Sequence, residues 1–132
     1  MRRLFLLAAL AALAGCDSLA EKTYPPAGDY PDATVGDLLA GAEGAGGLDP
    51  GRYNVTAHVV EAYPCPSETD CPTPGFVVLA PSLAPDPVGP AVTLGVEAPL
   101  QFRKRDRYRF SVEVTDAGGP TRALRLLGYS RV

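Results

Sequence analysis

The sequence predicts a mainly β fold for one small domain. Three observations support this: apolar and polar residues alternate over several short segments, turn-forming residues are frequent, and the chain is short. Gly and Pro occur 14 times each among 132 residues, while 20% of the residues are charged. This composition suits short strands joined by many turns. A chain of this length builds one modest core, so we expect a small barrel or a sandwich.

The N-terminus has the three parts of a bacterial signal peptide. Met1-Arg2-Arg3 is cationic, Leu4 to Leu13 is an unbroken apolar run, and small residues follow. A membrane-spanning helix needs about 20 apolar residues. The run is too short for that, so a retained membrane helix is the weaker alternative and removal of residues 1–15 is expected.

The end of this leader resembles the lipobox of bacterial lipoproteins. Leu13-Ala14-Gly15-Cys16 places small residues directly before a cysteine. The resemblance implies cleavage before Cys16, diacylation of its sulfur and attachment to a membrane by lipid, facing the periplasm or the exterior. Asp17 resembles a signal for retention in the inner membrane. The alternative is that Cys16 merely ends an ordinary secretory leader.

The next segment is expected to hold the domain away from the membrane. Residues 17 to about 31 contain few apolar side chains and the run Tyr24-Pro25-Pro26, which is typical of an extended, mobile tether. Thr34-Val-Gly-Asp37 then has capping-box spacing and predicts a short helix that glycines end. We therefore expect a signal peptide at 1–15, a lipidated N-terminus and flexible tether at 16–33, and a β domain at 34–132.

Five strands are predicted after this helix. We expect them at residues 52–63, 75–80, 91–96, 107–115 and 122–132. The first has Tyr53, Val55, Ala57 and Val59 on one face and Asn54, Thr56 and His58 on the other. The fourth alternates most regularly, with Tyr108, Phe110, Val112 and Val114 facing the core. In the fifth, the adjacent residues Leu126 and Leu127 predict a bulge or a twist.

Two further cysteines lie in one short loop. Cys65 and Cys71 form an even pair, and outside the cytoplasm such a pair is expected to make a disulfide. The alternative is a metal site that uses Cys65, Cys71 and His58, the only histidine. The cysteine spacing is wider than in a zinc knuckle and a fourth ligand is missing, so we expect no metal.

From residue 34 onward the chain resembles small bacterial lipoproteins with an OB fold. The resemblance rests on the short helix with its Val-Gly-Asp-Leu-Leu run, on Gly51-Arg-Tyr-Asn-Val-Thr-Ala-His-Val-Val, on the Pro-Cys-Pro loop and on Asp106-Arg-Tyr-Arg-Phe-Ser-Val-Glu-Val. It implies a five-stranded Greek-key barrel with a short N-terminal helix. The sequence departs from the pattern at residues 98–105, which leave room for a turn rather than a helix, and at Ala57-His58, where many members have glycine. An immunoglobulin-like sandwich is the alternative, although it needs about seven strands.

Catalytic and cofactor-binding patterns are missing from this sequence. A hydrolytic triad needs a nucleophile and a histidine base, and His58 lies within a predicted strand without a nucleophile motif nearby. Phosphate-binding loops and zinc-helix motifs are absent as well. We therefore expect no enzyme activity and no cofactor.

The charge of the chain disfavours nucleic acid or an anionic lipid surface as the main partner. The formal net charge is −3, from 12 basic and 15 acidic residues, and removal of Arg2 and Arg3 leaves 10 against 15, close to −5. The one basic concentration spans residues 103–109. In an OB fold it suggests a ligand site at Arg105, Arg107 and Arg109, but their alternation with aromatic residues favours a solvated face.

Three functional hypotheses remain. The first is a non-enzymatic envelope module that binds a protein, glycan or small ligand through one barrel face and the Cys65–Cys71 loop. The second is a structural protein that scaffolds an envelope complex, and the third is a metal-binding lipoprotein. The sequence predicts attachment to a membrane through the lipid anchor and no nucleic-acid partner, but it identifies no ligand.

Overall fold

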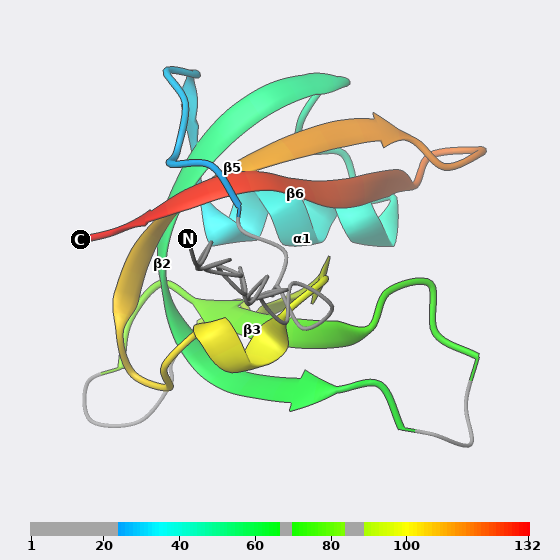
Figure 1. Cartoon of the computed structure of the whole chain (residues 1–132). Helices are drawn as coiled ribbons and strands as arrows, with labels where there is room; N and C mark the ends of the chain where they lie inside the picture. Colours follow the sequence, from blue (N-terminus) through cyan, green and yellow to red (C-terminus); the bar gives the residue numbers. More distant parts are fainter. Residues whose placement is uncertain (1–23, 67–69, 84–88) are drawn as a thin grey trace, which may run out of the picture.

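The computed structural model describes residues 24–66, 70–83 and 89–132. Cys16 and the predicted leader lie outside these residues. Within them, the chain forms one α-helix, one 3-10 helix and six strands (Figure 1). The elements are β1 (Asp32–Ala33), α1 (Val35–Glu43), β2 (Gly51–Pro64), β3 (Gly75–Ala80), β4 (Val92–Val96), η2 (Pro99–Gln101), β5 (Arg107–Asp116) and β6 (Arg122–Arg131). The five strands predicted from the sequence are confirmed, and the two-residue β1 is an addition.

The strands form one curled sheet in the order β4-β3-β2-β5-β6. Each neighbouring pair is antiparallel, and β1 adds a short parallel pair to β2. Curling brings the two end strands, β4 and β6, beside each other (Figure 1). Three successive strands followed by a fourth that returns beside the first is the expected OB-like arrangement. A single sheet excludes the immunoglobulin-like alternative, which needs two stacked sheets.

Strand β2 bends because it belongs to both halves of the sheet. Gly51 to His58 pair with β5, and His58 to Pro64 pair with β3. The register with β3 shifts between Val59 and Glu61, which leaves Val60 as an extra residue. A bulge of this kind bends and twists a strand. It supplies the curvature at a place where the sequence lacks the glycine of many OB folds.

A second bulge lies in β6, at the adjacent leucines where the sequence predicts a bulge or a twist. Ser111 pairs with Gly128 and Val112 pairs with Leu126, so Leu127 has no partner on β5. The extra residue changes which face the following side chains occupy. Leu126 is therefore buried in the core, while Tyr129 packs against the core beyond the bulge.

Helix α1 has the predicted capping box. Thr34 Oγ1 accepts a hydrogen bond from the Asp37 amide at 3.1 Å, and Asp37 Oδ2 accepts one from the Thr34 amide at 2.9 Å. The helix ends at Gly44, whose φ of 72° is the left-handed conformation that glycine adopts without penalty. Val35 and Leu38 join the core from the helix. No helix in the part of the chain described here is long and apolar enough to cross a membrane.

Residues 24–31, which we call the strap, lie extended against the outer face of the sheet. The Tyr129 amide donates to Pro25 O at 3.0 Å, and Asn54 Nδ2 donates to Gly28 O at 2.9 Å and to Tyr30 O at 3.2 Å. This differs from the expected flexible tether, because residues 24–33 are bound to strands β2, β5 and β6.

The strap also buries Asn54, which lies on the face of β2 opposite the core residues. Its side chain points away from the core, as expected, but only 1% of the residue is exposed because the strap covers it. Asn54 Oδ1 accepts a hydrogen bond from Ser111 Oγ at 2.6 Å, and Ser111 Oγ accepts one from the Gly28 amide at 2.8 Å. Asn54 and Ser111 thus form a buried polar pair that binds the strap.

Replacement of Asn54 by alanine should destabilise the protein. Asn54→Ala leaves buried hydrogen-bonding groups of Ser111 and the strap without a partner, so we expect the free energy of unfolding to fall by about 2–3 kcal/mol. Urea denaturation measures this loss. Thr56→Ala, two positions along the same strand, is the control and should change stability by less than about 1 kcal/mol. Equal losses in the two variants would contradict the role of the buried pair.

Candidate functional site

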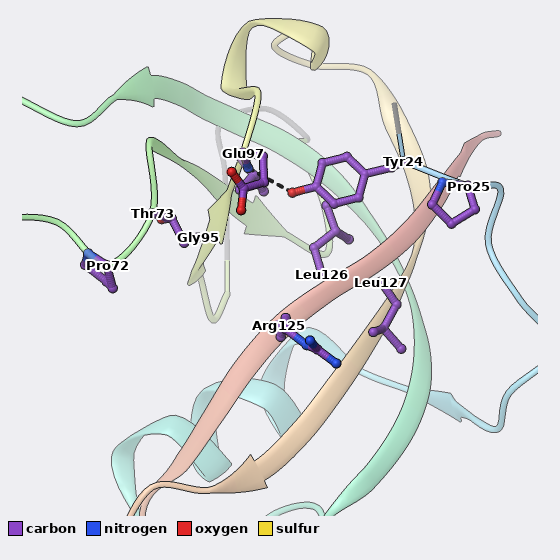
Figure 2. Close-up of a pocket in the computed structure, with 10 residues that line it drawn as sticks. Tyr24, Pro25, Pro72, Thr73, Gly95, Glu97, Arg125, Leu126 and Leu127 are labelled. Carbon is purple, nitrogen blue, oxygen red and sulfur yellow. Dashed lines mark hydrogen bonds between the residues drawn. The ribbon is translucent and has the colours of Figure 1, made fainter. Parts of the chain in front are cut away.

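A pocket of about 480 Å³ lies between β4 and β6. These are the two end strands of the described sheet, and they are not hydrogen-bonded to each other. We call the boundary between them the seam. The size of the pocket is in the range of small-ligand sites, roughly 300–1,000 Å³. Residues from both strands line it, together with the strap and the loop before β3 (Figure 2). The lining residues are Tyr24, Pro25, Pro72, Thr73, Gly95, Val96, Glu97, Arg125, Leu126 and Leu127.

The strap forms one wall and joins the two strands. The Tyr24 hydroxyl accepts a hydrogen bond from the Glu97 amide at 2.8 Å (Figure 2). The Tyr24 ring meets the Tyr129 ring edge-on at a centroid distance of 6.1 Å. Tyr24 therefore bridges the end of β4 and strand β6 at a place where their main chains do not pair.

Gly128 allows the strap to lie this close to β6. A Cβ atom at this position would lie 2.6 Å from Pro25 O and 2.8 Å from Pro26 O. Any other residue would thus displace the main chain of the strap, and Tyr24 with it. Burial raises the pKa of Tyr24, the hydrogen bond from the Glu97 main chain opposes this in part, and the charge of Glu97 adds to the rise.

The segment between the disulfide and β3, with Pro72 and Thr73, forms the opposite wall. Cys65 and Cys71 are joined as predicted, and the Cys65 amide donates to Pro74 O at 2.8 Å. Thr73 then lies over Gly95 of β4, where a Cβ atom would be 2.6 Å from Thr73 Oγ1. The glycine in β4 therefore admits the loop, and the loop encloses the pocket from the side away from the strap (Figure 2).

The pocket combines an apolar floor with opposite charges. Leu126 and Leu127 come from β6, Glu97 from the end of β4, and Arg125 from β6 at a distance from Tyr24 (Figure 2). Arg125 Nη2 lies 2.7 Å from Glu113 Oε1, and Arg52 Nε lies 3.3 Å from Glu113 Oε2. Desolvation raises the pKa of Glu113, but the two arginines outweigh it and lower the pKa overall. The ion pair with Glu113 therefore positions the Arg125 guanidinium beside the pocket.

The three arginines suggested as a ligand site lie elsewhere. Arg105, Arg107 and Arg109 are not among the residues that line the pocket. Arg109 Nη2 pairs with Asp32 Oδ1 at 3.3 Å, and Arg105 and Arg107 are exposed. The sequence does not predict the pocket, because its walls come from four segments that are distant along the chain. Tyr24 in addition lies in the segment that the sequence predicts as a flexible tether.

The cysteines and His58 do not come together as a metal site in this structure. Both sulfur atoms belong to the disulfide, and a metal would need them as thiolates. His58 Nδ1 is 3.3 Å from Arg105 O. In the described ranges, no group of three or more His, Cys, Asp or Glu side chains is arranged to hold a metal ion.

Loss of the disulfide should weaken the loop without unfolding the sheet. Because the bond closes a loop of only seven residues, Cys65→Ser/Cys71→Ser should lower the free energy of unfolding by about 2 kcal/mol. Urea denaturation measures this loss, and far-ultraviolet circular dichroism should show an unchanged β content. Thiol labelling of the native protein should detect neither cysteine before reduction. An unfolded double variant, or two reactive thiols in the native protein, would contradict this account.

Comparisons with models of known protein families, with characterised proteins and with solved structures found no match to this chain. The fold and the pocket therefore rest on the residues of this chain and their contacts.

Proposed function

We propose that this protein is a lipid-anchored component of the bacterial cell envelope whose domain binds a ligand without chemical conversion. The pocket at the seam is the observation that carries the binding function. The lipobox-like Leu13-Ala14-Gly15-Cys16 supports the anchor. The leader supports secretion, and the Cys65–Cys71 disulfide is in keeping with an oxidising compartment.

The walls of the pocket support binding because they are held in place before a ligand arrives. Tyr24 is fixed by Glu97 and Tyr129, while Thr73 is fixed by the disulfide loop and Gly95. Prearranged walls reduce the entropy lost when a ligand binds. The lining offers apolar contacts, a hydroxyl group and two opposite charges, which suits a small ligand with an apolar part and polar ends.

An envelope glycan or an extended protein segment fits this description. A disaccharide unit or a few peptide residues would fill a space of about 480 Å³. Each also has an apolar face together with groups that hydrogen-bond to Tyr24, Thr73, Glu97 or Arg125. The lining favours such recognition over hydrolysis, because glycoside hydrolysis uses two facing carboxyl groups and Glu97 is the one carboxyl side chain among the described lining residues.

The anchor would keep this pocket near the membrane. Tyr24 follows Cys16 by eight residues, and a fully extended chain spans at most about 3.6 Å per residue. The strap thus begins within about 30 Å of the lipid. A ligand of the pocket is therefore to be sought among molecules close to the membrane surface.

The anchor can be tested by mass. In a bacterial host, the mature chain should begin at Cys16 and carry a diacylglyceryl group, because the lipobox-like segment directs cleavage and acylation. Intact mass spectrometry of the membrane fraction measures both changes. Cys16→Ser is the control and should lose the acyl mass. A native protein that retains Met1 and no lipid would exclude the proposed anchor.

Binding at the pocket can be tested by nuclear magnetic resonance. Titration with short peptides and with glycan fragments from the envelope should shift the amide signals of Gly95, Glu97 and Leu127. Leu127→Glu should weaken the effective ligand at least about tenfold, since it places a charge on the apolar wall. Ala123→Glu, at an exposed position of the same strand outside the pocket, should bind normally. Shifts confined to residues 103–109, or equal losses in both variants, would argue against the pocket.

A further inference from the structure

One edge of the molecule combines unpaired arginines with exposed apolar residues. We call it the basic edge and define it as Leu100, Arg103, Arg105, Arg107 and Val132. Leu100 belongs to η2, the three arginines lie in the following loop and at the start of β5, and Val132 follows β6. The Val132 amide donates to Arg107 O at 3.0 Å, and the Arg103 amide donates to the Tyr108 hydroxyl at 3.0 Å, so the end of β6 and the loop after η2 both contact the start of β5.

The three arginines differ from their basic neighbours in having no acidic partner. Lys104 pairs with Glu61, Arg109 with Asp32 and Arg131 with Asp106, at 3.3, 3.3 and 2.8 Å. Arg103, Arg105 and Arg107 are exposed and form no ion pair with any residue that the structure describes. Their charges are therefore available to an anionic partner.

The same edge exposes apolar side chains that the core does not use. Leu100 is 80% exposed and Val132 is 65% exposed, which makes them two of the three large exposed hydrophobic residues in the described chain. Exposed apolar residues that accompany basic ones are suited to the boundary between phospholipid headgroups and acyl chains. A small soluble anion would use the arginines but would leave Leu100 without a role.

The backbone holds Arg105 in an unusual conformation. Its φ is 72°, in the left-handed region that glycine enters without penalty and other residues rarely adopt. Two hydrogen bonds hold this turn, from the Arg105 amide to Val59 O at 2.7 Å and from the Val59 amide to Asp106 O at 3.0 Å. The loop therefore presents its charges from a fixed main chain.

The basic edge lies at the same end of the molecule as the start of the strap. The Tyr24 hydroxyl is bonded to the amide of Glu97, which is three residues before Leu100. Tyr24 also contacts the ring of Tyr129, whose hydroxyl donates to Gln101 Oε1 of η2 at 3.3 Å. A chain that leaves Tyr24 toward a lipid anchor thus starts next to the basic edge.

We propose that the basic edge lies on the anionic phospholipid surface of the membrane to which the chain is anchored. Leu100 enters the headgroup region and the three arginines contact lipid phosphates. The acidic net charge does not prevent this, because at physiological ionic strength charges farther than about 8 Å from the surface are largely screened. The orientation rests on the proposed anchor, but the affinity of the edge for lipid does not.

The affinity can be measured without the lipid on Cys16. The chain from Asp17 to Val132 contains every residue of the described fold, including the strap. Its binding to vesicles of phosphatidylcholine mixed with an equal part of phosphatidylglycerol is measured by co-sedimentation. It should bind these vesicles, bind pure phosphatidylcholine far more weakly, and dissociate as salt is raised.

Two variants separate the charged and apolar contributions. Each basic residue at a membrane surface contributes about fivefold in affinity, so Arg103→Gln/Arg107→Gln should bind about twenty-fivefold more weakly. The matched control is Arg52→Gln/Arg122→Gln, which removes the same charge from the starts of β2 and β6, at the other end of β5 from Arg107, and should bind nearly normally. Leu100→Ser should weaken binding about fivefold and leave its salt dependence unchanged. Melting curves verify that each variant is folded.

The results distinguish this proposal from the proposed anchor. Equal binding to both vesicle types, or equal losses in the two double variants, would overturn the membrane role of the basic edge. Binding to free glycerol phosphate as tightly as to vesicles would overturn it too, because the surface would then recognise a soluble anion. If intact mass spectrometry finds the native protein unacylated while the chain from Asp17 still binds anionic vesicles through these residues, the anchor is excluded and the membrane role of the basic edge stands.

Discussion

The hydrogen bond between Asn54 and Ser111 joins the two central strands on the face of the sheet that a simple alternation would leave in water. Because both side chains are buried, their remaining donors and acceptors need partners. The main chain of Gly28 and Tyr30 supplies these partners. The polar pair thus binds the strap, and the strap in turn places Tyr24 at the seam. The position of this pocket wall therefore depends on hydrogen bonds that the strap makes to β2 and β5, away from the seam.

The seam follows from the way this sheet curls. Strands β4 and β6 are neighbours and run parallel, since each is related to β2 by an even number of antiparallel steps. Their main chains do not pair in the described sheet, so side chains and flanking segments close the gap. Tyr24 closes one end by a hydrogen bond to Glu97, and the disulfide loop covers the other side through Thr73 and Gly95. The space between them is the pocket.

Charge is distributed unevenly over the molecule. On the outer face of β2, β5 and β6, Glu113 holds Arg52 and Arg125, and Asp116 holds Arg122. Such exposed pairs contribute little to stability, usually less than about 1 kcal/mol each, but they neutralise the face. The loop before β5 has more arginines than acidic partners. Although the net charge of the chain is −3, the basic edge therefore carries arginines that form no ion pair with any residue in the described ranges.

Local patterns in the sequence determined much of the fold. Alternation predicted β2, β4 and β5, a short apolar run predicted β3, and the leucines with Tyr129 predicted β6. The Thr34 to Asp37 spacing predicted the helix start, and the adjacent leucines predicted the bulge at Leu127. Two cysteines six positions apart were enough to predict their bond. Each of these features depends on residues near one another in the chain, whose geometry follows from backbone periodicity and short-range hydrogen bonding.

Tertiary structure alone decided which polar residue is buried and where the pocket lies. Asn54 and Thr56 look alike in the alternation of β2, but only Asn54 is covered, by a strap that comes from more than 20 residues earlier in the chain. The pocket needs four segments that meet across an unpaired seam, and the sequence carries no periodic signal for such a meeting. The arginines of residues 103–109 also look equivalent in the sequence. Only the folded chain shows that Arg109 pairs with Asp32, while Arg105 and Arg107 have no acidic partner among residues 24–66, 70–83 and 89–132. Contacts between distant segments decide these points because burial and ion pairing depend on distance in space, whereas the sequence records only distance along the chain.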